Sequence, residues 1–150
     1  MREWFKILAA ALAALSLLMA APAMAQVPDP FARELAQKLA RAEQLVGAEG
    51  YSRAAGPFAG GLRSGEARAY TLMLRSGQDY RLVGVCDERC RDFDLRIFDA
   101  NGRVIAQDVL TDAVPIVHLR PYATGNYTIE ASMPRCDGAQ CWYAFNVYAR

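Results

Sequence analysis

Four cysteines form the clearest chemical pattern in this chain of 150 residues. Cys86 and Cys90 have three residues between them, and Cys136 and Cys141 have four. In an oxidising compartment an even number of cysteines predicts disulfides, and the short separations favour the local pairs Cys86–Cys90 and Cys136–Cys141. A four-thiolate zinc site and a redox-active dithiol are the alternatives, although both usually place two residues between paired cysteines.

Acidic side chains form a second group that could do chemistry. Asp92 and Asp94 lie on one face if this segment is extended, and Asp99 follows one strand later. Carboxylate oxygens are the ligands that calcium prefers, so these three residues are a candidate calcium site. The alternative is that interleaved arginines, such as Arg91 and Arg96, neutralise the carboxylates. No other cofactor is predicted.

Catalytic motifs are missing from the sequence. The only histidine is His118, and the chain contains no G-x-S-x-G motif, no H-E-x-x-H motif and no glycine-rich phosphate loop. We therefore predict that the protein is not an enzyme. A small periplasmic hydrolase is the less favoured alternative, and it would need two carboxylates, or His118 and a hydroxyl group, in one cleft.

Two aromatic residues near the end of the chain are candidate binding residues. Tyr143, Phe145 and Val147 alternate and suit a core, which turns Trp142 and Tyr148 toward the other face. Exposed Trp and Tyr side chains could stack on a sugar or contact a protein. Alternatively, a helix or a second sheet covers both of them.

The periodicity of apolar residues predicts the elements that position these groups. Residues 26–48 have helical spacing with Asp29 at the start and Gly47 at the end, which predicts one amphipathic α-helix. Residues 49–65 are rich in glycine and alanine and are predicted to be a linker. Residues 66–150 alternate with a period of two between frequent turn signals. This pattern predicts an antiparallel jelly-roll-like β-sandwich of seven to eight strands.

The first 25 residues have the form of a secretory signal peptide. Arg2 and Lys6 precede the uncharged residues 7–21, and the sequence Ala-Met-Ala at residues 23–25 suits cleavage after Ala25. The uncharged run is shorter than the roughly 20 residues that a membrane-spanning helix needs. We therefore expect a bacterial periplasmic or secreted protein with no membrane span after cleavage.

Composition limits the class of partner. Without residues 1–25 the chain keeps 15 basic and 15 acidic side chains. This balance gives no electrostatic basis for binding nucleic acid. The expected partner is an unknown protein or glycan in the cell envelope.

One stretch of the chain resembles a known family. Residues 92–102 run from an aspartate-rich strand into an Asp-x-Asn-Gly turn, and residues 77–80 and 124–129 add further matches. Together these segments resemble bacterial pre-peptidase C-terminal (PPC) domains over about residues 58–148. The resemblance implies a jelly-roll-like β-sandwich that accompanies secreted enzymes without being catalytic. It also implies that calcium or an extracellular polymer is a ligand of some members.

The sequence therefore predicts an exported, non-catalytic β-sandwich module for binding or envelope assembly. A calcium-dependent adhesion or polymer-binding module is the alternative within the same class.

Overall fold

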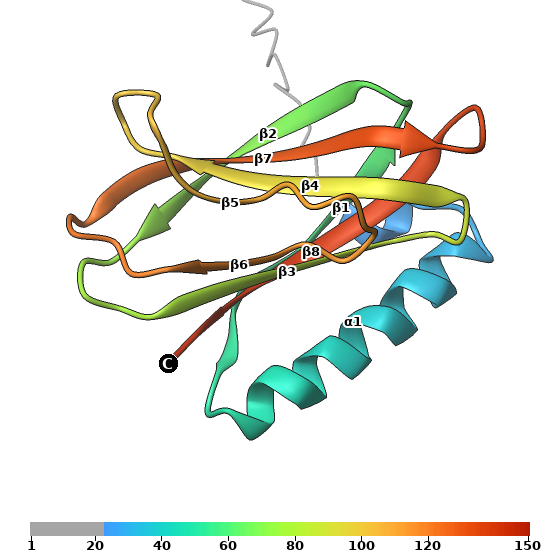
Figure 1. The fold of residues 1–150 in the computed structure, drawn as a ribbon. Coiled ribbons are helices and arrows are strands. Elements are labelled where there is room, and N and C mark those ends of the chain that lie inside the picture. Colours follow the sequence, from blue (N-terminus) through green and yellow to red (C-terminus); the bar gives the residue numbers. More distant parts are fainter. Residues whose placement is uncertain (1–22) are drawn as a thin grey trace, which may run out of the picture.

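The computed structural model describes residues 23–150, which form two antiparallel sheets of four strands each (Figure 1). The strands are β1 (Ser52–Leu62), β2 (Glu66–Leu74), β3 (Tyr80–Cys86), β4 (Cys90–Phe98), β5 (Val104–Asp108), β6 (Ile116–Leu119), β7 (Gly125–Cys136) and β8 (Cys141–Ala149). Sheet A has the strand order β1-β8-β3-β6, and sheet B has the order β2-β7-β4-β5. These two orders make an eight-stranded jelly roll. The predicted fold class, a jelly-roll-like β-sandwich preceded by an amphipathic helix, is confirmed.

Alternating apolar residues fill the space between the two sheets. Phe93, Leu95 and Ile97 of β4 are at most 1% exposed and face Tyr143 and Phe145 of β8 inside the sandwich. The ring of Phe145 also packs against two further aromatic rings, Phe58 of β1 at 4.8 Å and Tyr70 of β2 at 5.2 Å. Because side chains in a strand alternate between faces, one apolar face per strand is enough to build this core.

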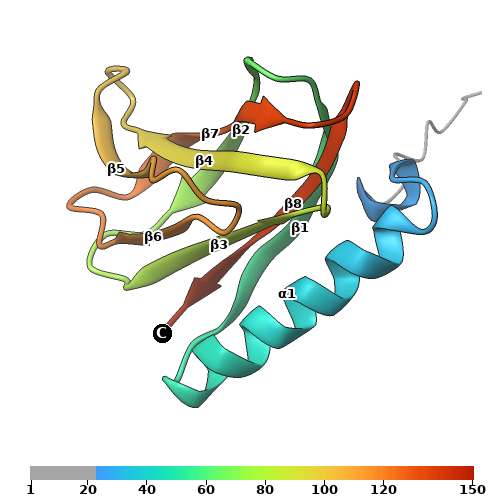
Figure 2. The same ribbon diagram turned by 45° about the vertical axis from the view of Figure 1, so that its right-hand side comes forward.

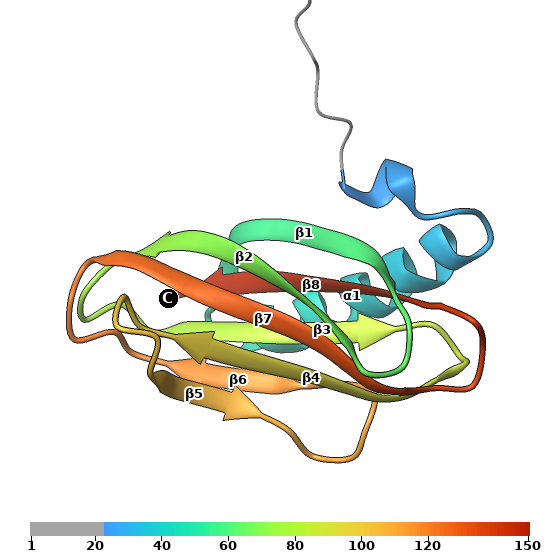
Figure 3. The ribbon, with the colours of Figure 1, turned by 90° about the horizontal axis from the view of Figure 1, so that it is seen from above.

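Helix α1 (Phe31–Ala48) covers the outer face of sheet A (Figure 2). Its buried residues Leu35, Leu39 and Val46 pack on side chains from β3 and β8. A short 3-10 helix, η1 (Ala23–Gln26), precedes it. Figure 3 looks onto sheet B, and no helix lies in front of that sheet. Within residues 23–150, a helix therefore covers the outer face of sheet A, and none covers the outer face of sheet B.

The two ends of α1 differ in detail from the prediction. The N-cap is Pro30, which has no side-chain cap hydrogen bond, and Asp29 instead forms an ion pair with Arg33 at 3.8 Å. At the other end the chain reverses at Gly50, whose φ of 87° is a left-handed conformation that favours glycine, and not at Gly47.

The prediction of a linker over residues 49–65 is wrong, because most of this segment is strand β1. Its alanines and glycines hide the period of two, and Gly56-Pro57 lies where the pairing with β8 shifts register. Proline is tolerated there because β1 is an edge strand. Glycine is required at position 56, where φ is 105° and an added Cβ atom would lie 3.0 Å from the backbone carbonyl oxygen of Phe145.

The predicted signal peptide lies almost wholly outside the described residues, which begin at residue 23. Within residues 23–150, no helix is both long and apolar enough to cross a membrane.

Candidate functional site

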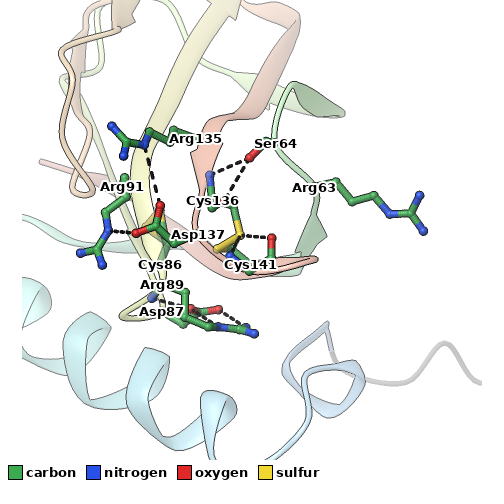
Figure 4. Close-up of a disulfide and its surroundings, with 12 residues drawn as sticks. Arg63, Ser64, Cys86, Asp87, Arg89, Arg91, Arg135, Cys136, Asp137 and Cys141 are labelled. Carbon is green, nitrogen blue, oxygen red and sulfur yellow. Dashed lines mark hydrogen bonds and ion pairs between the residues drawn. A yellow bond between two sulfur atoms is a disulfide. The ribbon is translucent and has the colours of Figure 1, made fainter.

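Two disulfides each close a loop at the same end of the sandwich. Cys86–Cys90 closes the β3–β4 loop and Cys136–Cys141 closes the β7–β8 loop, each with a Cα–Cα distance of 5.9 Å. This is the local pairing that the spacing predicted. Cys90 and Cys136 are also register partners in strands β4 and β7, so the two loops lie side by side (Figure 4).

Asp87, in the β3–β4 loop, forms hydrogen bonds that connect the segments at this end of the sandwich. Its side chain is fully buried and accepts hydrogen bonds from the guanidinium group of Arg89 at 2.9 and 3.0 Å and from the backbone N–H of Trp142 at 2.6 Å. Burial alone would raise the pKa of Asp87, but the bonds from Arg89 and Trp142 outweigh it and lower the pKa. Asp87 is therefore a structural carboxylate that links the β3–β4 loop to β8.

The three predicted calcium ligands do not form one site. Asp92 and Asp94 lie near the start of β4, whereas Asp99 follows its far end. There the Asp99 carboxylate accepts hydrogen bonds from the backbone N–H groups of Asn101 and Arg103 and from the Arg103 guanidinium at 2.9–3.1 Å. Turn formation therefore accounts for Asp99, which lies at the opposite end of β4 from the other two carboxylates. Across residues 23–150, no three His, Cys, Asp or Glu side chains are arranged to hold a metal ion.

Asp92 and Asp94 nevertheless each have one oxygen without a hydrogen-bond partner. The Oδ1 atom of each is buried and accepts no hydrogen bond from the described residues. Asp94 is only 6% exposed at its side chain, and its ion pair with Arg96 spans 3.7 Å. Burial, followed by repulsion from neighbouring carboxylates, raises the pKa of both groups; Asp112 repels Asp92, and Asp92 repels Asp94. These two carboxylates therefore destabilise the folded chain when they are ionised.

The predicted aromatic binding residues lie under the helix. Tyr148 is fully buried against Val46 and Val83, and its hydroxyl accepts a hydrogen bond from Asn146 at 3.1 Å. Trp142 is partly buried and packs on the apolar cluster below the first half of α1. The alternation correctly turns both side chains away from the core of the sandwich. Tyr148 cannot contact a ligand, however, because α1 covers that face of sheet A.

His118 has no catalytic surroundings in the described part of the chain. It is exposed on β6, opposite Arg81 of β3. The hollow beside it is lined by two arginines and one carboxylate, Asp79, and it contains no serine or threonine. It therefore offers neither a histidine with an aliphatic hydroxyl nor a pair of carboxylates.

The surface most suited to binding was not predicted from the sequence. Among residues 23–150, eight large apolar side chains are exposed, and five of these belong to α1, to the loop between β5 and β6, or to the start of β6. They are Leu45, Val109, Leu110, Val114 and Ile116. Two of them, Leu45 and Val114, line a groove of about 250 Å³, together with Lys38, Arg41, Ala42, Val85, Cys86 and Ala113. We call it the α1–loop groove.

Hydrogen bonds hold the loop that forms one wall of this groove. Asp108 accepts hydrogen bonds from the backbone N–H groups of Leu110 and Ile116 at 3.2 and 2.8 Å, and Asp112 accepts one from Val114 at 2.9 Å. The backbone N–H of Phe93 in β4 donates to the carbonyl of Asp112 at 2.8 Å. The loop is therefore ordered with its apolar side chains facing outward.

Helix α1 forms the opposite wall of the groove, and Lys38 fixes its position. Lys38 of α1 donates to Glu34 at 2.6 Å and to the backbone carbonyl of Cys86 at 2.7 Å, which ties the helix to the loop that the Cys86–Cys90 disulfide closes. Arg41, one turn further along the helix, is exposed at the rim. Figure 1 shows β3 and β6 on the side of the sandwich along which α1 lies.

Comparison with known proteins identifies the fold and no family. No family model matches the sequence, and no curated protein matches it. Among solved structures, the chain resembles PliG of Aeromonas hydrophila, a periplasmic inhibitor of g-type lysozyme, with a TM-score of 0.50 and 16% identity over 63% of this chain and 85% of that one. It also matches a CBM36 carbohydrate-binding module, solved with calcium and xylotriose, with a TM-score of 0.38 and 16% identity over 67% and 87% of the two chains. The likeness to the lysozyme inhibitor agrees with the β-sandwich fold described above.

Proposed function

We propose that this chain is an exported, non-catalytic β-sandwich module that binds a protein through the α1–loop groove. The observation that carries the proposal is the set of exposed apolar side chains on α1 and on the β5–β6 loop, two of which, Leu45 and Val114, line that groove. Asp108 and Asp112 hold the loop by hydrogen bonds. Monomeric proteins seldom leave a connected apolar surface open unless it serves an interaction. Export is supported by the signal-peptide pattern of residues 1–25 and by the two disulfides.

The chemistry of the groove favours a protein over a glycan. Sugar sites usually stack the apolar face of a ring on an aromatic side chain, and none of the residues that line this groove is aromatic. Its walls carry aliphatic side chains, such as Leu45 and Val114, which suit the apolar side chain of another polypeptide. The periplasmic lysozyme inhibitor shows that a protein of similar fold binds an enzyme, which supports this class of partner.

Site-specific photo-crosslinking in cells that export the protein tests the proposal. A benzophenone amino acid replaces Leu45 in one variant and Leu110 in another. The matched control replaces Met73, which is 59% exposed on β2 at the other edge of the sandwich. We expect a discrete adduct from positions 45 and 110 on irradiation and none from position 73. Irradiated chains that stay free at both groove positions would contradict the proposal; a g-type lysozyme or another protein in the adduct supports it.

Asp92 and Asp94 favour calcium binding as a second candidate. Their two buried, unpartnered carboxylate oxygens are ligands of the type that calcium uses, and backbone carbonyls and water would complete its coordination. Calorimetric titration of the metal-free protein with calcium tests this, with Asp94→Asn as the matched variant and magnesium as the control ion. Heat that appears with calcium in the parent chain and disappears in the variant supports the site. If calcium produces no heat with either the parent chain or the variant, the calcium site is excluded.

A further inference from the structure

We infer that the occupant of the α1–loop groove is a second copy of this chain. In this two-fold symmetric dimer, Leu110 of each copy enters the groove of the other. The inference rests on the proposed function, because it names the partner of the same surface. It follows from three features of that surface: its shape, its charges and the strand edges that it contains.

The surface carries both a projection and a recess. Leu110 follows directly after β5, is 68% exposed and has its backbone N–H held by Asp108. The groove is lined by Ala113 and Val114 of the same loop, and at about 250 Å³ it exceeds the roughly 150 Å³ apolar cavity that accommodates benzene, so it has room for a leucine side chain. A two-fold interface places the same patch on both subunits, so a residue and the recess that receives it must share one surface. Leu110 and the groove meet this requirement.

The charges on the two sides of the groove are opposite. The helix side carries Lys38 and Arg41, and the loop side carries Asp108 and Asp112. A two-fold axis that runs along the groove brings the basic helix side of one copy against the acidic loop side of the other. Arg41 then faces Asp112 of the second copy, and both side chains are exposed in the single chain. The equal numbers of acidic and basic side chains after residue 25 add no net repulsion between the copies.

The dimer would also cover exposed strand edges. Strands β5 and β6 are edge strands of sheets B and A, and they follow each other along the chain at this side of the sandwich. Exposed edges invite pairing with other chains, and proteins commonly cover or blunt them. Ile116, which is 44% exposed at the start of β6, would be buried against the second copy.

Sedimentation of the exported, purified protein over a range of concentrations tests the inference. We expect a reversible monomer–dimer equilibrium. Leu110→Asp and Leu45→Asp should each weaken the dimer at least about tenfold, because each places a charge in an apolar contact. Met73→Asp, an exposed change outside the groove, should leave the equilibrium unchanged. Thermal unfolding of each variant checks that the fold is retained.

Charge reversal gives a second test that a folding defect cannot imitate. Arg41→Glu and Asp112→Lys should each weaken self-association, but an equal mixture of the two variants should form a heterodimer. Asp112 also accepts a hydrogen bond from Val114, so Asp112→Asn, which keeps an acceptor, serves if the lysine variant is unstable. With Asp112→Asn, the expected result is a weaker dimer that no longer responds to Arg41→Glu.

The outcomes separate this inference from the proposed function. A chain that stays monomeric, or a dimer that survives both leucine substitutions, overturns the second-copy assignment. If that monomer still gives a crosslinked adduct with a different protein from position 110, the proposed function stands. If it gives no adduct, both fail.

Discussion

Asp87 and Asp94 are buried carboxylates only seven residues apart in the sequence, and the fold treats them in opposite ways. Asp87 accepts hydrogen bonds from Arg89 and from the Trp142 backbone, which lower its pKa despite burial. Asp94 has an Oδ1 atom without a partner, and burial next to Asp92 raises its pKa. Similar burial therefore does not mean a similar contribution to stability. What matters is whether each oxygen has a donor.

The two carboxylates lie in different parts of the molecule: Asp87 at the end that the disulfides close, and Asp94 beside the proposed binding surface. Asp87 lies in the loop that the Cys86–Cys90 disulfide closes, where it joins two strands. Asp94 is next to Phe93, whose backbone N–H holds the β5–β6 loop. Residues that serve binding are often not optimal for stability. Asp92 and Asp94, each with one oxygen that accepts no hydrogen bond, fit this pattern.

The largest expected effect comes from Asp87→Ala. This change leaves the buried N–H of Trp142 and part of the Arg89 guanidinium without an acceptor, so we expect a loss of about 2–4 kcal/mol in the free energy of unfolding. For a domain of this size, that corresponds to roughly 3–5 °C of Tm for each kcal/mol. Thermal and urea unfolding at pH 7 measure it.

Asp137→Ala is the matched control. Asp137 also pairs with two arginines, Arg91 and Arg135, but it is 41% exposed. Its loss should change Tm much less than the loss of Asp87, because exposed ion pairs are screened by water. Equal effects of the two substitutions would contradict the structural role assigned to burial at Asp87.

Removing the Cys86–Cys90 disulfide should have the next largest effect. A loop of this length constrains the unfolded chain modestly, so the double change Cys86→Ala and Cys90→Ala should cost about 2 kcal/mol. Combined with Asp87→Ala it should cost less than the sum of the two effects, because both act on one loop. Urea unfolding of the three variants measures this coupling. Additive losses would mean that the disulfide and Asp87 act independently.

The sequence predicted the features that depend on local pattern. Alternating apolar residues such as Phe93, Leu95 and Ile97 predicted the sandwich, because one buried face of a strand is visible in sequence. Loop closure predicted the two disulfide pairs. Strand β1 was not predicted, because its alanines and glycines differ little in hydrophobicity and its alternation was therefore not visible in the sequence.

Features that depend on packing between distant segments could not be predicted in the same way. The period of two correctly predicted that Tyr148 points away from the core. It could not show that α1 covers the face of sheet A on which Tyr148 lies. The exposure of Leu110 and Ile116 likewise depends on β5 and β6 being sheet edges, which is a property of the strand order. The candidate binding surface was therefore missed.

Asp94→Asn should stabilise the protein at pH 7 by about 1 kcal/mol, because it removes a buried charge that lacks a donor. The raised pKa means that the folded chain binds this proton more tightly than the unfolded chain. Stability therefore falls as pH rises from the unfolded value, about 3.9, through the folded value. The advantage of the variant should be full at neutral pH and disappear below pH about 3.5. Unfolding curves from pH 3 to 7 in calcium-free buffer measure it.

Asp87 should give the opposite pH dependence. Its lowered pKa means that its contribution is present above the unfolded value and is lost as pH falls through the folded value. The effect of Asp87→Ala should therefore shrink on acidification. A constant difference between parent and variant across this range, for Asp87 or for Asp94, would contradict the assigned pKa direction of that residue.

The smallest expected effect is the coupling between Asp92 and Asp94. Repulsion from Asp92 is the largest cause of the raised pKa of Asp94 after burial, so Asp92→Asn should lower the pKa of Asp94 toward its ordinary value. The substitutions Asp92→Asn and Asp94→Asn should then stabilise the protein together by about 0.5 kcal/mol less than the sum of their separate effects, since the first already relieves part of the cost of the second. NMR titration of the Asp94 carboxyl carbon in the Asp92→Asn variant measures the shift directly. Burial, and after it Asp108 and Asp112, also raise the pKa of Asp94, so part of the elevation should persist without Asp92. A full return to the ordinary value would contradict the assignment of burial as the main cause of the raised pKa.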